Sequence, residues 1–208
     1  MVAIVDYGVG NLFSLKSSFA AIGVEVIVTA DPEVLKNADS IVLPGVGAFE
    51  DAAKKLRDSG LDKVLIQLAG SGKPLLGICL GMQLLFEKSY EYGEHTGLGL
   101  IKGSVKPIKD VIPAELKIPH IGWNPLEFKK ETPMFSYIND GDCVYFVHSF
   151  YAVDCDASVV AVSEYGALLT AAVQNKNVFG CQFHPEKSGK VGLNILKAFA
   201  EIKENEIC

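Results

Sequence analysis

Strand and helix signals alternate along the first half of the chain, and no other feature of the sequence limits the fold as strongly. Short apolar runs that predict strands lie at residues 2–5, 24–28, 41–43 and 75–78. Helical signals follow these runs at residues 12–22, from Pro32, at 49–58 and 61–69, and from Cys79 to about Phe86. This order predicts an α/β fold with a mostly parallel central sheet flanked by helices on both faces.

The second half of the chain predicts additional, partly antiparallel strands. The strand-like runs are separated by short polar or glycine-containing turns and lie at residues 101–108, 144–148, 159–162, 168–173 and 178–183. A final amphipathic helix is expected after Ser188, with Leu193, Leu196 and Phe199 on its apolar side. No repeat, linker or low-complexity tract divides the chain, so we expect a single domain over residues 1–208.

Charge and hydropathy argue against several classes of function. The net charge is −6 and no strong basic stripe is present, so a nucleic-acid partner is not expected. No apolar run approaches the roughly 18–20 residues that a membrane helix needs, so no membrane partner is expected. Residues 1–6 lack a basic region and end at Asp6, which predicts a first strand rather than a signal peptide.

Cysteine and histidine spacing favours reduced thiols over a disulfide framework or a metal site. The cysteines are odd in number and lack CxxC spacing; they are Cys79, Cys143, Cys155, Cys181 and Cys208. This usage is typical of a cytoplasmic protein. No histidine has a second histidine two or four residues later, and no carboxylate cluster completes a ligand set, so no metal or other cofactor is expected.

The strongest chemical signal is a cysteine between two glycines, at the point where a predicted strand runs into a predicted helix. Residues 77–81 read Gly-Ile-Cys-Leu-Gly, the thiol counterpart of the G-x-S-x-G nucleophile elbow. Gly77 and Gly81 allow a sharp turn, and the helix N-terminus favours a thiolate at Cys79. The Leu80 N–H is a candidate oxyanion donor. A buried structural cysteine between packing glycines is the alternative interpretation of this pattern alone.

A thiolate that acts on an amide needs a general acid and base, and His184 is the best candidate among the four histidines. It ends an apolar strand and lies two residues before Glu186, which can accept from the imidazole and fix its tautomer. A histidine at a surface strand end is the simpler alternative. His148 and His120 are expected to be structural or to line a pocket, and His95 to lie in a solvated loop.

A glycine-containing loop at residues 44–47, Pro-Gly-Val-Gly, follows a predicted strand and precedes a predicted helix. Gly45 and Gly47 permit unusual φ angles and the close approach of a ligand. With Val46 between them, they are candidates for the second oxyanion donor. A plain tight turn and a phosphate loop remain open, although the loop lacks the Lys-Ser/Thr of a P-loop.

These segments together resemble a known family. Residues 44–47, residues 77–83 and the His-Pro-Glu of residues 184–186 occur in the order and spacing of class I (triad) glutamine amidotransferases. Further segments resemble the glutaminase subunits of imidazole glycerol phosphate synthases, which act in histidine biosynthesis. These segments lie at residues 6–12, 97–100, 119–124, 145–149 and 184–189, so the resemblance runs nearly end to end.

The resemblance implies a glutaminase with a catalytic triad. Cys79 would attack the side-chain amide of glutamine and form a glutamyl thioester. His184 would protonate the departing ammonia and then activate water, while Glu186 orients His184. Backbone N–H groups of Leu80 and of the loop at residues 45–47 would form the oxyanion hole.

The resemblance also implies how glutamine is held and where its ammonia goes. Gln83 and Ser149 would bind the substrate glutamine. Phe150 stands where some relatives have a tyrosine, so its contribution departs from their pattern. Ammonia would pass to a (β/α)8-barrel cyclase subunit in a heterodimer, whose products are imidazole glycerol phosphate and an aminoimidazole carboxamide ribotide.

The resemblance implies a partner surface as well. The residues that would lie at or near it are Asn11, Trp123, Tyr145 and Lys187. Because ammonia made without an acceptor wastes glutamine, we expect allosteric control by the partner, with the loop at residues 44–47 as the switch.

Two other functions are weighed against this one. The glutaminase subunit of pyridoxal phosphate synthase shares the triad, but the segments at residues 122–124 and 146–149 fit it poorly. A non-catalytic scaffold with a cysteine elbow is the third possibility, and it has no need of the His-Pro-Glu at residues 184–186.

Overall fold

The structure is a computed structural model in which residues 1–203 are described; Cys208 lies outside the described residues. Its central sheet has the strand order β2-β1-β3-β4-β14-β13-β12-β9. The parallel part consists of β2 (Val26–Thr29), β1 (Val2–Val5), β3 (Ser40–Leu43), β4 (Leu75–Ile78) and β14 (Val178–Cys181). The antiparallel part consists of β13 (Leu168–Asn175), β12 (Val159–Glu164) and β9 (Glu127–Phe128). The α/β fold with a mostly parallel sheet and added antiparallel strands is thereby confirmed.

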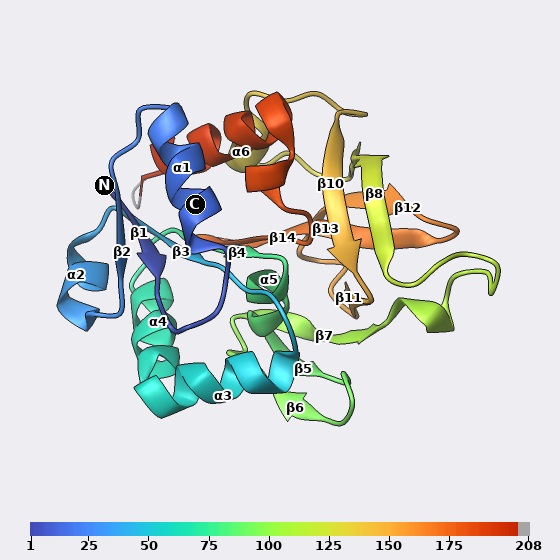
Figure 1. The fold of residues 1–208 in the computed structure, drawn as a ribbon, viewed down its shortest axis with the longest axis horizontal. Coiled ribbons are helices and arrows are strands. Elements are labelled where there is room, and N and C mark those ends of the chain that lie inside the picture. The colour runs from blue at the N-terminus through green and yellow to red at the C-terminus, as the bar shows by residue number, and fades with distance from the viewer. Residues whose placement is uncertain (204–208) are drawn as a thin grey trace.

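Helices cover both faces of this sheet (Figure 1). On one face lie α1 (Leu12–Ala21) and α6 (Gly189–Glu201), which contact each other. On the other face lie α2 (Pro32–Asn37), α3 (Phe49–Ser59), α4 (Leu61–Gly70) and α5 (Leu80–Leu84). Among the helices of residues 1–203, none combines the length and apolar character that crossing a bilayer requires.

Two smaller sheets flank the end of the central sheet where β4 meets α5. One pairs β8 (His120–Pro125) with β10 (Cys143–His148), antiparallel. The other has the order β11 (Phe150–Val153), β7 (Ile101–Pro107), β5 (Phe86–Ser89) and β6 (His95–Thr96). Short 3₁₀ turns lie at η1 (Ile108–Asp110), η2 (Pro133–Phe135) and η3 (Pro185–Lys187).

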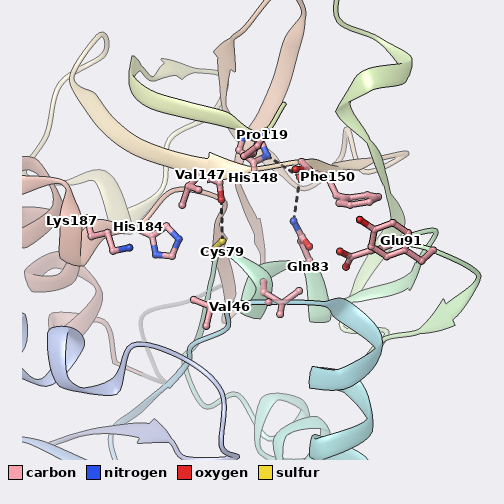
Figure 2. Close-up of a pocket in the computed structure, with 14 residues that line it drawn as sticks. Val46, Cys79, Gln83, Glu91, Pro119, Val147, His148, Phe150, His184 and Lys187 are labelled. Atoms are coloured by element: carbon pink, nitrogen blue, oxygen red, sulfur yellow. Dashed lines mark hydrogen bonds between the residues drawn. The ribbon is translucent and has the colours of Figure 1, made fainter. Parts of the chain in front are cut away.

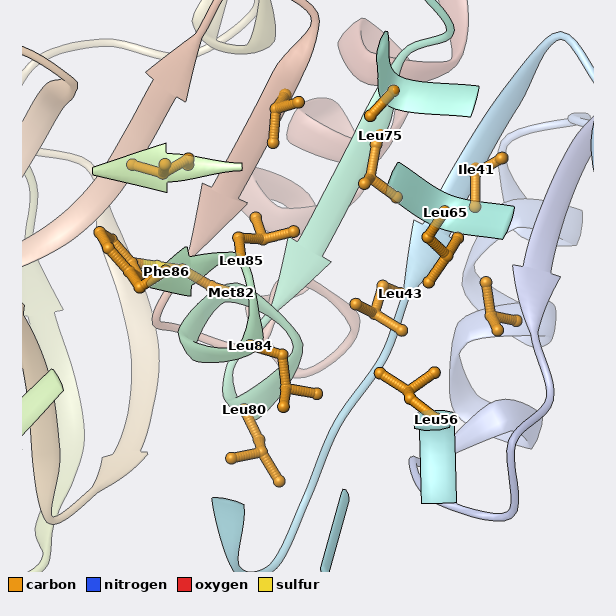
Figure 3. Packing of buried hydrophobic residues seen from close by; sticks show 14 of the residues in the cluster. Ile41, Leu43, Leu56, Leu65, Leu75, Leu80, Met82, Leu84, Leu85 and Phe86 are labelled. Carbon is orange, nitrogen blue, oxygen red and sulfur yellow. The ribbon is translucent and has the colours of Figure 1, made fainter. Parts of the chain in front are cut away.

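The core lies on both faces of the central sheet because its parallel strands are buried on both sides. In β1, Ala3 and Val5 join the cluster under α3 and α4, whereas Val2 and Ile4 join the cluster under α1 and α6. This alternation follows the two-residue repeat of a strand. Figure 3 shows the first cluster continuing from the leucines of β3 and β4 to α5 and Phe86. The core thus extends to the turn that carries Cys79.

The structure differs from the sequence prediction after Cys79. The helix expected to reach about Phe86 ends at Leu84, because Phe86 begins β5 and pairs with Ile101 of β7. Several strands were not expected at all: β5, β6, β8, β9 and β11. Most are short, and β8 includes Gly122 and ends at Pro125, so pairing with β10 outweighs a local sequence typical of a loop.

A substitution at Gly81 tests whether the turn depends on close packing. A Cβ at Gly81 would collide with the carbonyl oxygen of Leu43 in β3. We therefore expect Gly81→Ala to lower the free energy of unfolding by about 1–3 kcal/mol in urea titrations, the usual range for overpacking.

Gly70→Ala is the matched control. Gly70 ends α4, its φ is not in the left-handed region, and a Cβ there would meet no atom within 4 Å. This variant should be as stable as the parent or up to about 1 kcal/mol more stable. Equal stability of Gly81→Ala and Gly70→Ala would contradict the packing argument.

Candidate active site

Cys79 lies in a strained turn between β4 and α5. Its φ of 54° and ψ of −113° place a non-glycine residue where side chains rarely occur, a conformation that costs on the order of 1–3 kcal/mol. A Cβ at Gly77 would lie 2.6 Å from the carbonyl oxygen of Gly81, so the turn closes only with small residues at both positions. The sharp strand–turn–helix geometry predicted for residues 77–81 is therefore present, and it is the geometry of a nucleophile elbow.

His184 and Glu186 follow β14, the strand next to β4. The His184 N–H donates to the Tyr145 carbonyl at 2.9 Å, and the Ser188 hydroxyl donates to the His184 carbonyl at 2.6 Å. These two contacts fix the backbone on either side of the imidazole. The Nδ1 atom of His184 lies 2.8 Å from Oε1 of Glu186, and both side chains are buried.

The charge on His184 depends on its two neighbours. Burial alone would lower the pKa of His184, but a hydrogen bond with Cys79 and the hydrogen bond and charge of Glu186 raise that pKa to about 9. His184 is therefore an imidazolium at neutral pH. An imidazolium at this position can stabilise a thiolate on a neighbouring cysteine and can donate a proton.

A cavity of about 350 Å³ opens beside the Cys79 sulfur. Figure 2 shows Cys79 at its centre, with His184 and Lys187 on one side and Gln83 and Glu91 on the other. Of the residues singled out in the sequence, those that line the cavity are Val46, Gly47, Cys79, Leu80, Gln83, His148, Ser149, Phe150, His184 and Lys187. Glu186 does not line the cavity and contacts His184 instead. All the lining residues together come from six separate segments of the chain.

The loop at residues 44–47 packs directly on the elbow. Gly47 has a φ of 92°, in the left-handed region, and Gly45 does not. Gly45 is required instead for close packing, because a Cβ there would lie 2.5 Å from the Gly81 nitrogen. The expectation of unusual φ angles therefore holds for Gly47 alone. The Tyr7 hydroxyl donates to the Pro44 carbonyl at 2.7 Å and fixes the start of the loop.

Leu80 begins α5, so its N–H is one of the first four helix donors that have no partner within the helix. Leu80 lines the cavity together with Cys79, Val46 and Gly47. Backbone N–H groups at such a position can stabilise an oxyanion.

Gln83 is held by two hydrogen bonds. Its Nε2 donates to the Phe150 carbonyl at 3.2 Å and to Oε1 of Gln182 at 3.0 Å. Phe150 also lines the cavity. The hydrogen bond from Gln83 to Phe150 therefore links helix α5 to the segment after β10 at the cavity wall. Ser149 lies in the same segment, and its carbonyl accepts from the Ile108 N–H at 3.0 Å.

Two residues in this region were missed by sequence reasoning. Glu91 lines the cavity, and its Oε2 accepts from the Phe49 N–H at the start of α3 at 2.7 Å. Burial raises the pKa of Glu91, and the Phe49 hydrogen bond opposes this. Gln182 is fully buried, and its Nε2 lies 3.7 Å from the Cys79 sulfur. No sequence motif contains Glu91, so nothing in the sequence indicated its place in the cavity. Gln182 lies two residues before His184, and this spacing could have indicated that it lies near the site.

The other histidines have the structural roles expected, with one exception. His148 lines the cavity, and its ring contacts the Phe150 carbonyl at 2.8 Å and His120 at 3.0 Å. Burial lowers the pKa of His148 to about 4, so it stays neutral. His95 was expected in a solvated loop, but it begins β6 and its side chain is only 17% exposed. Within residues 1–203, no group of three or more potential ligands could hold a metal ion.

Three of the four residues expected at a partner surface lie together. The Trp123 and Tyr145 rings are 6.0 Å apart on the paired strands β8 and β10, and the Lys187 ammonium lies 5.9 Å from the Tyr145 ring. Trp123 is 54% exposed. Asn11 is the N-cap of α1, where its side chain accepts from the Ser14 N–H at 3.3 Å.

Comparison with known proteins identifies the family. The glutamine amidotransferase class-I model matches residues 3–202. The chain belongs to the class-I glutamine amidotransferase family. Similar curated proteins are "Imidazole glycerol phosphate synthase subunit HisH" of Lactococcus lactis, 48% identical over 96% of this chain and 98% of that protein, and of Aquifex aeolicus, 50% identical over 94% of each.

Solved structures confirm the fold of this amidotransferase. "Crystal structure of glutamine amidotransferase" matches with a TM-score of 0.73 at 20% identity and covers 95% of this chain and 98% of its own. "Structure of PurLQS from Thermotoga maritima" matches with a TM-score of 0.73 at 22% identity and covers 95% and 96%. At this identity the likeness shows the fold alone.

The charge on His184 predicts how stability depends on pH. The pKa of His184 is about 9 in the folded chain against 6.5 for an ordinary histidine, so the folded state binds the proton more tightly. The stabilisation is complete below about pH 6.5 and is lost as the pH rises to about 9. The difference of about 2.5 pKa units corresponds to at most about 3.4 kcal/mol, at 1.36 kcal/mol per pKa unit.

Urea unfolding of the parent and of His184→Gln between pH 6 and 9.5 measures this difference. The stability advantage of the parent should shrink as the pH rises. His95→Gln is the control and should preserve the pH dependence of the parent. An advantage that stays constant or grows with pH would contradict the proposed charge on His184.

Proposed function

We propose that this chain is the glutaminase subunit of an imidazole glycerol phosphate synthase and that it acts through Cys79, His184 and Glu186. The observation that carries the proposal is the geometry of these groups. The Cys79 sulfur lies on a strained elbow beside a cavity of about 350 Å³, next to a histidine whose Nδ1 is 2.8 Å from a buried carboxylate. Relatives 47–50% identical over nearly the whole chain carry that enzyme's name.

The reaction follows from the charges of the site. The Cys79 thiolate attacks the side-chain carbonyl of glutamine, and the negative charge moves to the carbonyl oxygen. The His184 imidazolium gives its proton to the nitrogen, the C–N bond breaks, and ammonia leaves a glutamyl thioester. Neutral His184 then takes a proton from water, the hydroxide attacks the thioester, and glutamate departs as the thiolate re-forms. Glu186 keeps the imidazole oriented in both steps.

The oxyanion is proposed to bind at the junction of α5 and the loop at residues 45–47. The Leu80 N–H is free of intrahelical bonds, and Val46 and Gly47 line the cavity beside it. Gly45 packs directly against Leu80 and Gly81 and is proposed to help place this backbone. One such donor lowers the activation barrier of the chemical step by about 2.7–4 kcal/mol.

The rest of the cavity suits an amino acid. Gln83 and Ser149 line the cavity and are proposed to contact glutamine. The Glu91 carboxylate lies on the same side of the cavity as Gln83 in Figure 2 and can pair with the α-ammonium group. If Glu91 holds the α-ammonium group of glutamine, the side-chain amide of the same molecule would point toward Cys79.

The partner is proposed to be a (β/α)8-barrel cyclase that receives the ammonia. The name of the relatives includes the word subunit, which implies a partner chain. Trp123 and Lys187 are exposed beside the half-buried Tyr145 ring, and Lys187 also lines the cavity. With Asn11, these three are the proposed contact residues. A single amidotransferase domain over residues 1–208 and a cytoplasmic location complete the proposal.

The rival functions have less support. The curated relatives are named for imidazole glycerol phosphate synthase and not for pyridoxal phosphate synthase. A scaffold without activity gives no reason for a buried hydrogen bond between His184 and Glu186 beside the Cys79 sulfur.

Separating ammonia production from its use tests the triad. In the complex with the cyclase, Cys79→Ser and His184→Ala should each abolish synthesis from glutamine and leave synthesis from a high concentration of ammonium salt intact. Cys143→Ser is the matched control, because Cys143 is exposed on β10, and it should keep full activity with glutamine. Glutamine-dependent activity above about a tenth of the parent value in Cys79→Ser, a change under about 1.4 kcal/mol, would show that the nucleophile is another group.

Control by the partner is tested at Gly47. The φ of 92° at Gly47 lets the neighbouring peptide plane turn so that either an N–H or a carbonyl faces the oxyanion position. Binding of the cyclase with its nucleotide should therefore raise kcat for glutamine by at least about 10²-fold, the contribution of one donor. Gly47→Ala should reduce this activation although a Cβ there meets no atom within 4 Å. Equal turnover of the free chain, the complex and the liganded complex would rule out the switch.

A further inference from the structure

Two buried glutamines contact each other beside the nucleophile, and the reaction as described uses only one of them. Gln83 belongs to α5, and Gln182 directly follows β14. Gln182 has no exposed surface, does not line the cavity, and places its Nε2 3.7 Å from the Cys79 sulfur. A buried amide group needs a partner for each of its polar atoms, so this contact requires a physical explanation.

The orientation of the Gln182 amide is determined by a chain of hydrogen bonds. The Phe150 carbonyl can only accept, so the group of Gln83 that faces it at 3.2 Å is the amino group, Nε2. The same amino group donates to Gln182 at 3.0 Å, so the Gln182 atom that receives this bond is its oxygen, Oε1. The amino group of Gln182 therefore faces the sulfur of Cys79.

The sulfur lies between a donor and an acceptor. The Cys79 sulfur lies 4.0 Å from the Val147 carbonyl oxygen. This oxygen can accept a hydrogen bond from a neutral thiol and repels a thiolate. The sulfur also lies 3.7 Å from the Gln182 amino group, and this donor stabilises a thiolate. The balance of these contacts, with the nearby His184 imidazolium, sets how much of Cys79 is ionised.

We propose that Gln182 donates a hydrogen bond to the Cys79 thiolate, and that Gln83 holds Gln182 in the orientation this requires. The donor is neutral, so it remains in place when His184 has passed its proton to ammonia. It acts again when the thioester breaks and the electron pair of the C–S bond returns to sulfur. Gln182 contacts a reacting atom and is thus a catalytic residue, whereas Gln83 acts through it as a positioning residue.

The inference rests on the proposed nucleophile but is measured without turnover. The test is alkylation of Cys79 by iodoacetamide between pH 5 and 10 in the full chain, followed by mass spectrometry of the peptide that contains Cys79. The alkylation rate follows the thiolate fraction. Gln182→Met has a side chain of similar length and no donor, so the midpoint of its profile should move up by about one pH unit. At pH values below the midpoint this is a roughly tenfold slower reaction, with the plateau at high pH unchanged.

Turnover in the complex supplies a second readout. Gln182 lies outside the cavity lining, so Gln182→Met should lower kcat for glutamine several-fold and leave KM nearly unchanged. Gln174→Met is the matched control, because the Gln174 amide on β13 donates only to the Lys176 carbonyl at 3.0 Å in a partly exposed position. It should reproduce the parent in both assays. Circular dichroism and thermal unfolding check that each variant is folded.

Gln182→Glu keeps the shape and reverses the interaction. Gln83 would still donate to one carboxyl oxygen, while the other faces the sulfur as a donor only when protonated. The midpoint of its alkylation profile should lie above that of the parent by more than in Gln182→Met, because a carboxylate beside the sulfur repels the thiolate. This variant decides the question if Gln182→Met does not fold. An unshifted alkylation profile in both variants, with or without a change in kcat, would overturn the proposal. A shifted profile with no glutaminase activity in any complex, including the parent, would instead refute the proposed function and leave the thiolate donor standing.

Discussion

The close contact between two neighbouring parallel strand ends is the constraint on which the site depends. β3 and β4 pair in parallel, so the loop after β3 and the elbow after β4 emerge side by side at one edge of the sheet. They meet through backbone alone, since a Cβ at Gly45 would lie 2.5 Å from the Gly81 nitrogen. β14 pairs with β4 on the other side and delivers His184 to the same edge. Three segments far apart in sequence thereby surround one sulfur atom.

A buried charge pair is what this arrangement has to maintain. His184 and Glu186 are almost completely buried, and burial alone disfavours the charged form of each. Their mutual hydrogen bond and the contact with Cys79 reverse this effect for His184. The Oε2 atom of Glu186 has no hydrogen-bond partner among the described residues, an arrangement that costs about 1–3 kcal/mol. The strained backbone of Cys79 and this unpaired oxygen are stability costs located at two residues of the proposed catalytic triad.

The sequence was most informative where function follows from local backbone chemistry. The glycines around Cys79 and the order of strands and helices follow from short-range rules, and the parallel sheet is as predicted. Glu91 and Gln182 were missed because each acts through contacts with residues remote in sequence, such as the Phe49 N–H and Gln83. Likewise β8 and β11 form through pairing with distant strands, which no local pattern announces. The role of Gly45 in packing was visible only once the neighbouring strand was known.

The central claim is that Cys79 forms a covalent bond with the glutamyl group. Rapid acid quench of the complex during turnover of glutamine, followed by peptide mass spectrometry, tests it directly. The account predicts a glutamyl thioester on the peptide that contains Cys79, and none on the peptides that contain Cys143, Cys155 or Cys181. A glutamyl adduct on another cysteine, or turnover at the full rate with no adduct on Cys79 at any quench time, would contradict it.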